Sequence, residues 1–174
     1  MTEIPGVHRV QSGSAWEEAI GSARAVAAGD RVIVAGMMPS TDGTVPGEDE
    51  PYGQTLSAFH SALSALEPFG LGAADVIRTR MYLSHARDVD EVGRAHRELF
   101  GAVRPAATMV VVAGFTDSRV LVEVELEAYR GAAAGAVAET GAQAGAVTGA
   151  EAGAVTGAQA GAEAAAGATG GATP

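Results

Sequence analysis

The segment Val120–Ala128 constrains the fold of this chain more than any other stretch. Its residues alternate between apolar and other side chains, which is the period of a β-strand with two unlike faces. The apolar face is made of Val120, Val122, Val124 and Leu126. The opposite face carries the carboxylates of Glu123, Glu125 and Glu127. Because a strand cannot bury three carboxylates without partners, this face must meet cations, water or a ligand.

Arginines at a matching spacing occur in a second predicted strand, Asp75–Ser84. Arg78, Arg80 and Tyr82 share one face of it with Val76, and the other face is made of Ile77, Thr79, Met81 and Leu83. Paired across the sheet, the arginines would neutralise the glutamates. Two interpretations stay open. The charges form either a solvated salt-bridge face or a charged pocket at an interface.

The remaining periodicity predicts a mixed α+β sheet. The predicted strands are Val7–Val10, Arg24–Ala28, Arg31–Met38, Asp75–Ser84, Thr108–Val112 and Val120–Ala128. The apolar run Thr108–Val112 predicts a strand buried on both faces, joined to the last strand as an antiparallel hairpin. Predicted helices run from Tyr52 to Phe69, after Pro51, and from the cap Asp88 to Phe100 or Val103, with Val89, Val92, Leu99 and Phe100 facing the sheet. Both helices have one apolar stripe and cover one sheet face, so the other face is left for a partner chain.

Composition divides the chain in two. Residues 1–130 predict one domain, whereas residues 131–174 contain 19 Ala and 11 Gly and repeat the octads TGAQAGAV, TGAEAGAV and TGAQAGAE. We expect this tail to be disordered, because small side chains offer little area to offset the entropy of ordering. The alternative, a stacked solenoid, lacks large residues to fill a core.

Charge and residue usage exclude several functions. The net charge is −10, all 11 basic residues are arginines, and there is no cysteine or lysine. Nucleic-acid binding, thiolate chemistry, cysteine-based metal sites and lysine Schiff bases are therefore not expected. The four histidines lack metal-ligand spacing, and no cofactor motif is present. Without a membrane span or a secretory signal, a cytoplasmic protein is expected.

Two single residues stand out. Trp16, the only tryptophan, predicts a core or interface anchor. Gly36, inside an apolar strand, predicts a bulge or a close approach of backbone or ligand.

The order of elements and several segments resemble the YjgF/RidA family of reactive-intermediate deaminases. The segments are SGSAWEEAIGSARAVAAGDRVIVAG, VIRTRMYL, HRELFG, RPAATMVVV and LVEVELEAY, within about residues 9–129. The resemblance implies a chorismate-mutase-like α+β fold and a homotrimeric barrel with small-molecule pockets at subunit interfaces. It also implies hydrolysis of enamines or imines, with an arginine holding the substrate carboxylate and a glutamate positioning water.

Glu123 falls where the family glutamate is expected, but other family positions differ. The arginine corresponds to Ala107, an aromatic hydroxyl to Ala23, a serine to Ala35, an asparagine to Gly93 and a cysteine to Met109. Arg24, Arg80 and Arg119 remain open as substitutes for the arginine.

Two functions remain. The first is hydrolysis of a small imine, enamine or related C–N metabolite, with Glu123 as the catalytic residue. Candidate substrate-binding residues are Gly36, Met37, Thr108, Met109, Trp16, Arg24, Arg80 and His96. The alternative is a non-catalytic trimer that binds a small metabolite.

Overall fold

A computed structural model describes residues 4–39, 44–47 and 49–131. All of them lie in the first of two units, Met1–Val137, and the second unit, Ala138–Pro174, lies outside the described residues. The predicted repeat tail, apart from Gly131, falls outside them as well, so the tail and the domain boundary stay predictions.

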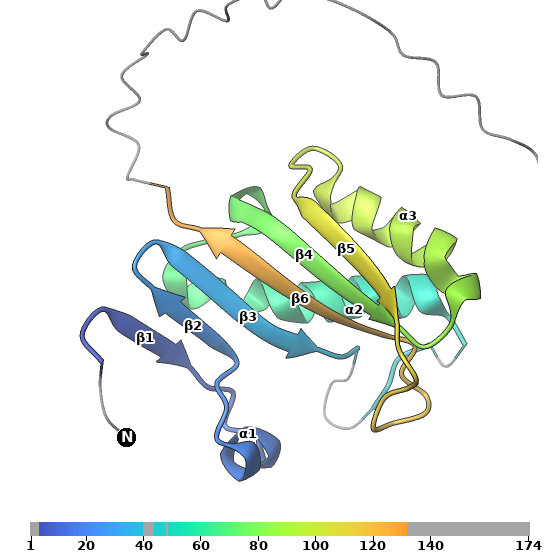
Figure 1. The fold of residues 1–174 in the computed structure, drawn as a ribbon, viewed down its shortest axis with the longest axis horizontal. Coiled ribbons are helices and arrows are strands. Elements are labelled where there is room, and N and C mark those ends of the chain that lie inside the picture. Colours follow the sequence, from blue (N-terminus) through green and yellow to red (C-terminus); the bar gives the residue numbers. More distant parts are fainter. Residues whose placement is uncertain (1–3, 40–43, 48, 132–174) are drawn as a thin grey trace, which may run out of the picture. The chain divides into compact units, whose positions relative to one another are not determined.

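Six strands form one mixed sheet (Figure 1). They are β1 (Val7–Val10), β2 (Ala25–Ala28), β3 (Arg31–Met37), β4 (Val76–Leu83), β5 (Ala106–Val111) and β6 (Val122–Tyr129). The spatial order is β1-β2-β3-β6-β4-β5, and only β4 and β5 run parallel. The acidic strand β6 therefore lies inside the sheet, between β3 and β4.

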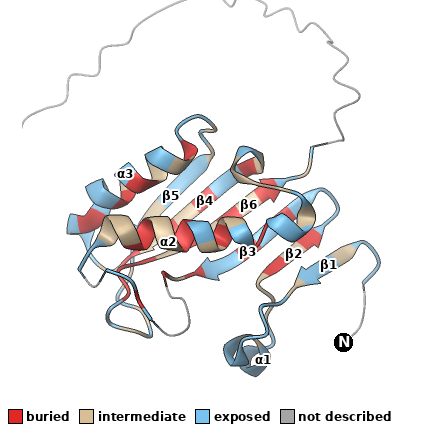
Figure 2. Cartoon of the chain, turned by 180° about the vertical axis from the view of Figure 1, so that it is seen from behind, coloured by how far each residue is buried: buried red, intermediate tan, exposed pale blue. Residues whose placement is uncertain are grey.

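Helices α2 (Pro51–Ser64) and α3 (Val89–Phe100) cover one face of the sheet (Figure 2), which confirms the predicted α+β layer. The first predicted helix is shorter than expected, because it ends at Ser64 and a 3₁₀ turn, η1 (Glu67–Phe69), follows. Pro68 explains the break, since proline has no N–H to continue the helical ladder. The 3₁₀ turns η2 (Ala73–Asp75) and η3 (Ala86–Asp88) flank β4, and a short helix, α1 (Ala15–Ile20), precedes β2.

The core lies between the helices and the sheet. The predicted apolar face of β6 is buried there, with Val122, Val124, Leu126 and Ala128 at 1% exposure or less. Phe59 of α2 and Phe100 of α3 pack edge-to-face above it, with ring centroids 5.1 Å apart. The period-2 pattern therefore predicted correctly which face of β6 meets the helices.

The predicted hairpin of the last two strands is wrong. β5 pairs in parallel with β4 at the sheet edge, and the connection that follows returns the chain to place β6 on the other side of β4. β5 is also exposed rather than buried on both faces, with Val110 and Val111 at 46% and 49% exposure. An apolar run predicts a strand, but it does not specify the neighbouring strand.

Two smaller predictions are also wrong, and a third is wrong in one of its alternatives. Val76 is buried and Ile77 is 40% exposed, because the register with β6 shifts between Val76 and Arg78 and exchanges the faces of the two residues. Val89, at the first position of α3, is 41% exposed and does not face the core. Of the two alternatives for Trp16, the core anchor is excluded, because the side chain is 64% exposed, and the interface anchor stays a prediction.

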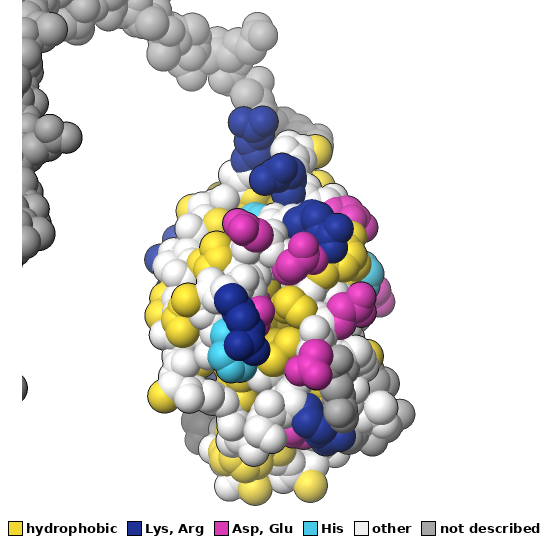
Figure 3. Space-filling model, turned by 90° about the vertical axis from the view of Figure 1, so that its right-hand side faces the viewer, with side chains coloured by type: hydrophobic (Ala, Val, Ile, Leu, Met, Phe, Trp, Pro, Cys, Tyr) yellow, Lys and Arg dark blue, Asp and Glu magenta, His cyan; other side chains and the backbone are white. Residues whose placement is uncertain are grey.

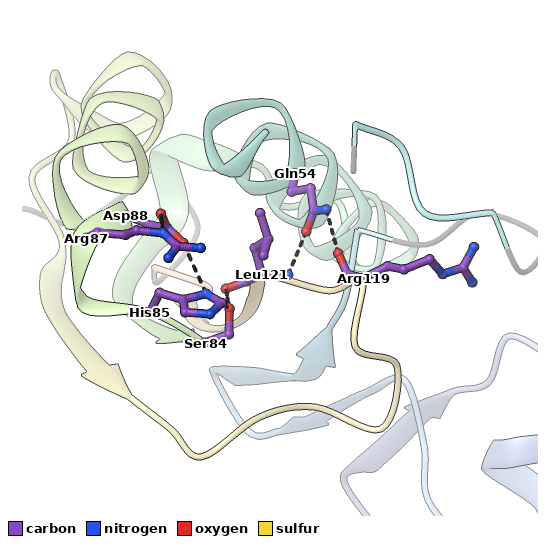
Figure 4. Close-up of polar contacts among 7 residues, drawn as sticks. All are labelled: Gln54, Ser84, His85, Arg87, Asp88, Arg119 and Leu121. Atoms are coloured by element: carbon purple, nitrogen blue, oxygen red, sulfur yellow. Dashed lines mark hydrogen bonds and ion pairs between the residues drawn. The ribbon is translucent and has the colours of Figure 1, made fainter. Parts of the chain in front are cut away.

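A buried glutamine fastens the segment that leads into β6. Gln54 of α2 is fully buried, and its side-chain amide donates to the carbonyls of Gly47 and Arg119 at 3.1 and 2.9 Å. Its oxygen accepts from the N–H of Leu121 at 2.8 Å (Figure 4). One side chain therefore satisfies three backbone groups and fixes the point at which β6 enters the sheet.

We predict that Gln54→Leu destabilises the domain by about 1–3 kcal/mol, because it leaves those backbone groups without their partner. Urea denaturation measures the loss. Gln11→Leu, at an exposed position, is the control and should change stability by less than about 0.5 kcal/mol. Equal effects of the two substitutions would contradict the role given to Gln54.

Candidate active site

The open face of the sheet carries a ladder of cross-strand pairs between β4 and β6. Arg78 lies opposite Glu127, Arg80 opposite Glu125, and Tyr82 opposite Glu123. Arg80 Nη1 lies 2.9 Å from Glu125 Oε2, and Arg78 Nη1 lies 3.4 Å from Glu127 Oε1. The expected pairing of arginines with glutamates is thus observed. It leaves Glu123 without an ion pair in the described part of the chain.

The carboxylate of Glu123 lies against the backbone of Gly36 on β3. A Cβ atom added at Gly36 would stand 1.9 Å from Glu123 Oε1, so only glycine leaves room for this side chain. The register of β3 with β6 also shifts between Val34 and Met37. The predicted bulge at Gly36 is therefore observed, and the group that approaches it closely is a side chain, not the backbone or ligand that was predicted.

Burial raises the pKa of Glu123, and the nearby charge of Glu125 raises it further. A carboxyl group of this kind is a better proton acceptor, once ionised, than an ordinary surface glutamate. Burial and the neighbouring charge thus give Glu123 a property that acid–base residues share.

An open cavity of about 620 Å³ adjoins Glu123. Its walls include four of the predicted substrate-binding residues, namely Trp16, Arg24, Gly36 and Met37. Ala23 and Ala35, where the family was expected to have a hydroxyl and a serine, also line it. A second cavity, of about 350 Å³, is also lined by both Trp16 and Glu123. Its other lining residues are Met38, Gly114, Phe115 and Thr116.

Helix α1 forms one wall of the larger cavity. Ser14 caps it by accepting a hydrogen bond from the N–H of Glu17 at 3.1 Å. The Glu17 carboxylate accepts from the N–H and hydroxyl of Ser12, both at 2.7 Å. The sequence signal for this helix is the Ser-x-x-Glu spacing of Ser14 and Glu17, which is typical of a helix start. Glu17 also lines the cavity and was not among the predicted site residues.

Arg24 precedes β2 and reaches toward α2. Its Nη2 donates to the carbonyl of Ser61 at 3.2 Å, and Ser61 lines the same cavity. Arg24 forms no ion pair within the described residues. It thus places a positive charge in the wall of the cavity that holds Glu123.

The other predicted site residues lie elsewhere. Arg80 is engaged with Glu125 and Glu127 in the ladder. Thr108 and Met109 are on β5, which β4 separates from β6. His96 lies on the helix side of the sheet, where Nε2 is 2.9 Å from Thr79 Oγ1 and its ring contacts Phe59 and Phe100. Burial lowers the pKa of His96, as expected for a neutral ring in the core.

A serine, a histidine and an aspartate also meet between β4 and α3 (Figure 4). Ser84 Oγ lies 2.8 Å from His85 Nδ1, and Asp88 Oδ2 lies 3.7 Å from the same nitrogen. A hydrolytic triad needs the serine and the carboxylate on opposite ring nitrogens. These three residues therefore do not form one.

Metal-binding clusters and membrane-spanning helices are lacking in residues 4–39, 44–47 and 49–131. This part of the chain contains no cluster of three or more His, Asp or Glu side chains able to hold a metal, and no helix long and apolar enough to span a membrane. On the side of the domain shown in Figure 3, basic and acidic side chains are interspersed with apolar ones. No broad basic surface is present on that side.

Comparison with known proteins agrees with this architecture. The family model "Endoribonuclease L-PSP" matches residues 16–130. The chain belongs to the YjgF/RidA family. It is 64% identical over 126 residues to the uncharacterized protein SCO2049 of Streptomyces coelicolor, covering 72% of this chain and 94% of the relative.

Solved structures of the family have the same fold. Rv2704 of Mycobacterium tuberculosis, a member of the YjgF/YER057c/UK114 family, is 38% identical with a TM-score of 0.64, covering 71% of this chain and 98% of that protein. The YjgF gene product of E. coli is 25% identical with a TM-score of 0.57, covering 62% and 87% of the two chains.

We predict that alanine at two glycines acts differently on Glu123. Gly36→Ala displaces the Glu123 carboxylate, the flexible end of that side chain, and should therefore return the pKa of Glu123 toward the ordinary range of glutamate. Gly93→Ala, in α3 with no atom within 4 Å of the added Cβ, should leave that pKa unchanged and gain about 0.5–1 kcal/mol of stability by helix propensity. Carbon-13 NMR titration and urea denaturation measure the two effects. A pKa of Glu123 that is unchanged in Gly36→Ala would show that the carboxylate does not lie against Gly36.

Proposed function

We propose that this protein hydrolyses the C=N bond of a small imine, or of the enamine in equilibrium with it, with Glu123 activating the attacking water. The observation that supports this most is the environment of the Glu123 carboxylate. It is partly buried against Gly36, it forms no ion pair with an arginine within the described residues, and it is open to a cavity. A general base needs this combination of restricted hydration and access to substrate.

The proposed reaction needs no cofactor. Glu123 accepts a proton from water while the oxygen adds to the imine carbon, and it returns this proton to the nitrogen to give a carbinolamine. The same carboxylate then takes the proton of the new hydroxyl group and passes it to the nitrogen. The C–N bond breaks, the carbonyl forms, and ammonia leaves. One carboxyl group thus serves as base and then as acid, for which a raised pKa is suited.

Arg24 is the arginine that best fits the role of orienting a substrate carboxylate. It lines the cavity of Glu123, whereas Arg80 pairs with Glu125 and Arg119 pairs with Asp117 at 2.7 Å. An arginine in the cavity wall would offset the absence of one at Ala107, since a guanidinium binds carboxylates through paired hydrogen bonds.

RNA cleavage, to which the name of the family model refers, is not favoured for this chain. Binding phosphates requires clustered positive charge, yet the net charge is −10. The larger cavity is also lined by more acidic than basic side chains, namely the carboxylates of Glu17 and Glu123 and the single arginine Arg24.

The homotrimer and the interface location of the pocket belong to this proposal. The open sheet face, with its ladder of charges, and the exposed edge strand β5 are surfaces that a second copy would cover. The cytoplasmic location also stays a prediction.

Metabolite binding without catalysis remains the second candidate. Ala23 and Ala35 favour it, because the cavity has methyl groups where the family resemblance implied hydroxyl groups. Ammonia release separates the candidates. A protein that only binds the ligand would be stabilised by it and would not raise the rate of ammonia release above the spontaneous rate.

We predict that Glu123→Gln reduces ammonia release from imines by at least about 100-fold, the usual contribution of a general base. The imines are formed in solution from amino acids by an amino-acid oxidase, and ammonia is followed against the spontaneous rate. Glu67→Gln, in η1 away from the cavity, should keep full activity.

The pH dependence should follow the same group. Because Glu123 acts in its ionised form and its pKa is raised, activity should fall on acidification at a higher pH than for an ordinary glutamate.

Activity that is unchanged in Glu123→Gln would refute the mechanism.

A further inference from the structure

We propose that Trp16 determines substrate specificity by providing an aromatic wall for a substrate with a flat apolar side chain, such as an aromatic imino acid. The inference rests on the proposed function. It adds the class of side chain that the substrate carries and the residue that selects it.

The position of Trp16 is the first support. Its side chain lines both of the cavities that Glu123 lines, so a ligand in either cavity lies next to Trp16 and to the proposed catalytic residue. It is nevertheless 64% exposed, and Ile20, one turn later on the same helix, is 55% exposed. Two large apolar side chains are thus held in water at the rim of a polar site, where a ligand can cover them.

The construction of α1 is the second support. None of its residues is buried, so packing of the core does not explain why Trp16 is placed here. Gly13 and Gly21, with φ of 76° and 69°, flank the helix in a conformation that favours glycine. Hydrogen bonds from Ser12 and to Ser14 hold the first turn of the helix through Glu17, so the indole is presented by an element fixed through its ends.

The size of the cavity is the third support. Liquid water takes about 30 Å³ per molecule, so a compound of about seven heavy atoms would fill roughly a third of the larger cavity. The volume of about 620 Å³ therefore suits a larger ligand. On the same scale a phenyl group takes about 180 Å³, so the remainder has room for one.

The distribution of charge gives the ligand its orientation. The charged part of the wall is Arg24 with the carboxylates of Glu17 and Glu123, and Arg24 is its one positive charge. The apolar part includes Trp16, Ile20 and Met38. A substrate carboxylate at Arg24 and a C=N group at Glu123 would direct the side chain toward the indole. A contact between the indole of Trp16 and an aromatic ring of the substrate stabilises the complex by more than the burial of apolar area alone provides.

Binding of two stable probes tests the proposal. Phenyllactate and lactate share a carboxylate and a 2-hydroxyl group and differ in the phenyl ring. We expect phenyllactate to bind at least about tenfold more tightly by calorimetry, because it buries a ring that lactate lacks. Since Trp16 is the only tryptophan, its fluorescence should change with phenyllactate and not with lactate.

Two variants make the test specific. Trp16→Ala should bind both probes with nearly equal affinity, and Trp16→Phe should keep most of the preference. Equal binding of the probes by the unaltered protein, or a preference that survives in Trp16→Ala, would overturn the proposal. So would a loss of oligomer in Trp16→Ala without any effect on probe binding, which would make Trp16 an interface anchor.

A separate arm distinguishes this inference from the proposed hydrolysis. Imines formed from phenylalanine and alanine are compared for ammonia release. A preference for phenyllactate without release from either imine would refute hydrolysis and retain the role of Trp16. Equal release from both imines, lost in Glu123→Gln, would retain hydrolysis and refute the role of Trp16.

Discussion

The pairing of β4 with β6 is the constraint on which the rest of the site depends. It sets arginines opposite Glu125 and Glu127, and it sets Tyr82 opposite Glu123. Exposed ion pairs of this kind contribute little stability each, but a register shifted by one residue would turn every charge toward the core. The ladder therefore specifies the register, and the register leaves one carboxylate available for chemistry.

The position of Glu123 also depends on the strand on its other side. Gly36 gives the carboxylate space over β3, and the bulge there brings Met37 to the cavity. Glu123 thus lies between a tyrosine and a glycine, where it is shielded from water without being neutralised. Helix α1 and Arg24 then complete the cavity around it.

Much of this was predictable because it follows from local periodicity. The alternation in β6 predicted the core face and the acidic face, and the spacing of Arg78 and Arg80 predicted their pairing with glutamates. The order of the strands was not predictable in this way, because the apolar run of β5 fits more than one neighbour. The bulge at Ile77 was missed for a related reason, since strict alternation assumes an unbroken register.

For the site, too, local features could be predicted from the sequence and the arrangement of elements in space could not. Gly36 was predicted because a glycine inside an apolar strand is unfavourable without a reason such as close contact. His96 was predicted from its place beside the apolar face of α3, but that face packs on the opposite side of the sheet from Glu123. Helix α1 has only 6 residues, too few to produce a periodic signal, and its capping residues are what indicate it.

The central claim is that Glu123 is a partly buried, unneutralised carboxylate suited to accept a proton. Carbon-13 NMR titration of the glutamate carboxyl groups tests this most directly, with the Glu123 signal assigned by its loss in Glu123→Gln. The account predicts that the pKa of Glu123 lies above the ordinary range of glutamate, because burial and Glu125 both disfavour ionisation. A pKa at or below the ordinary value would show a hydrated or neutralised carboxylate and would contradict the account.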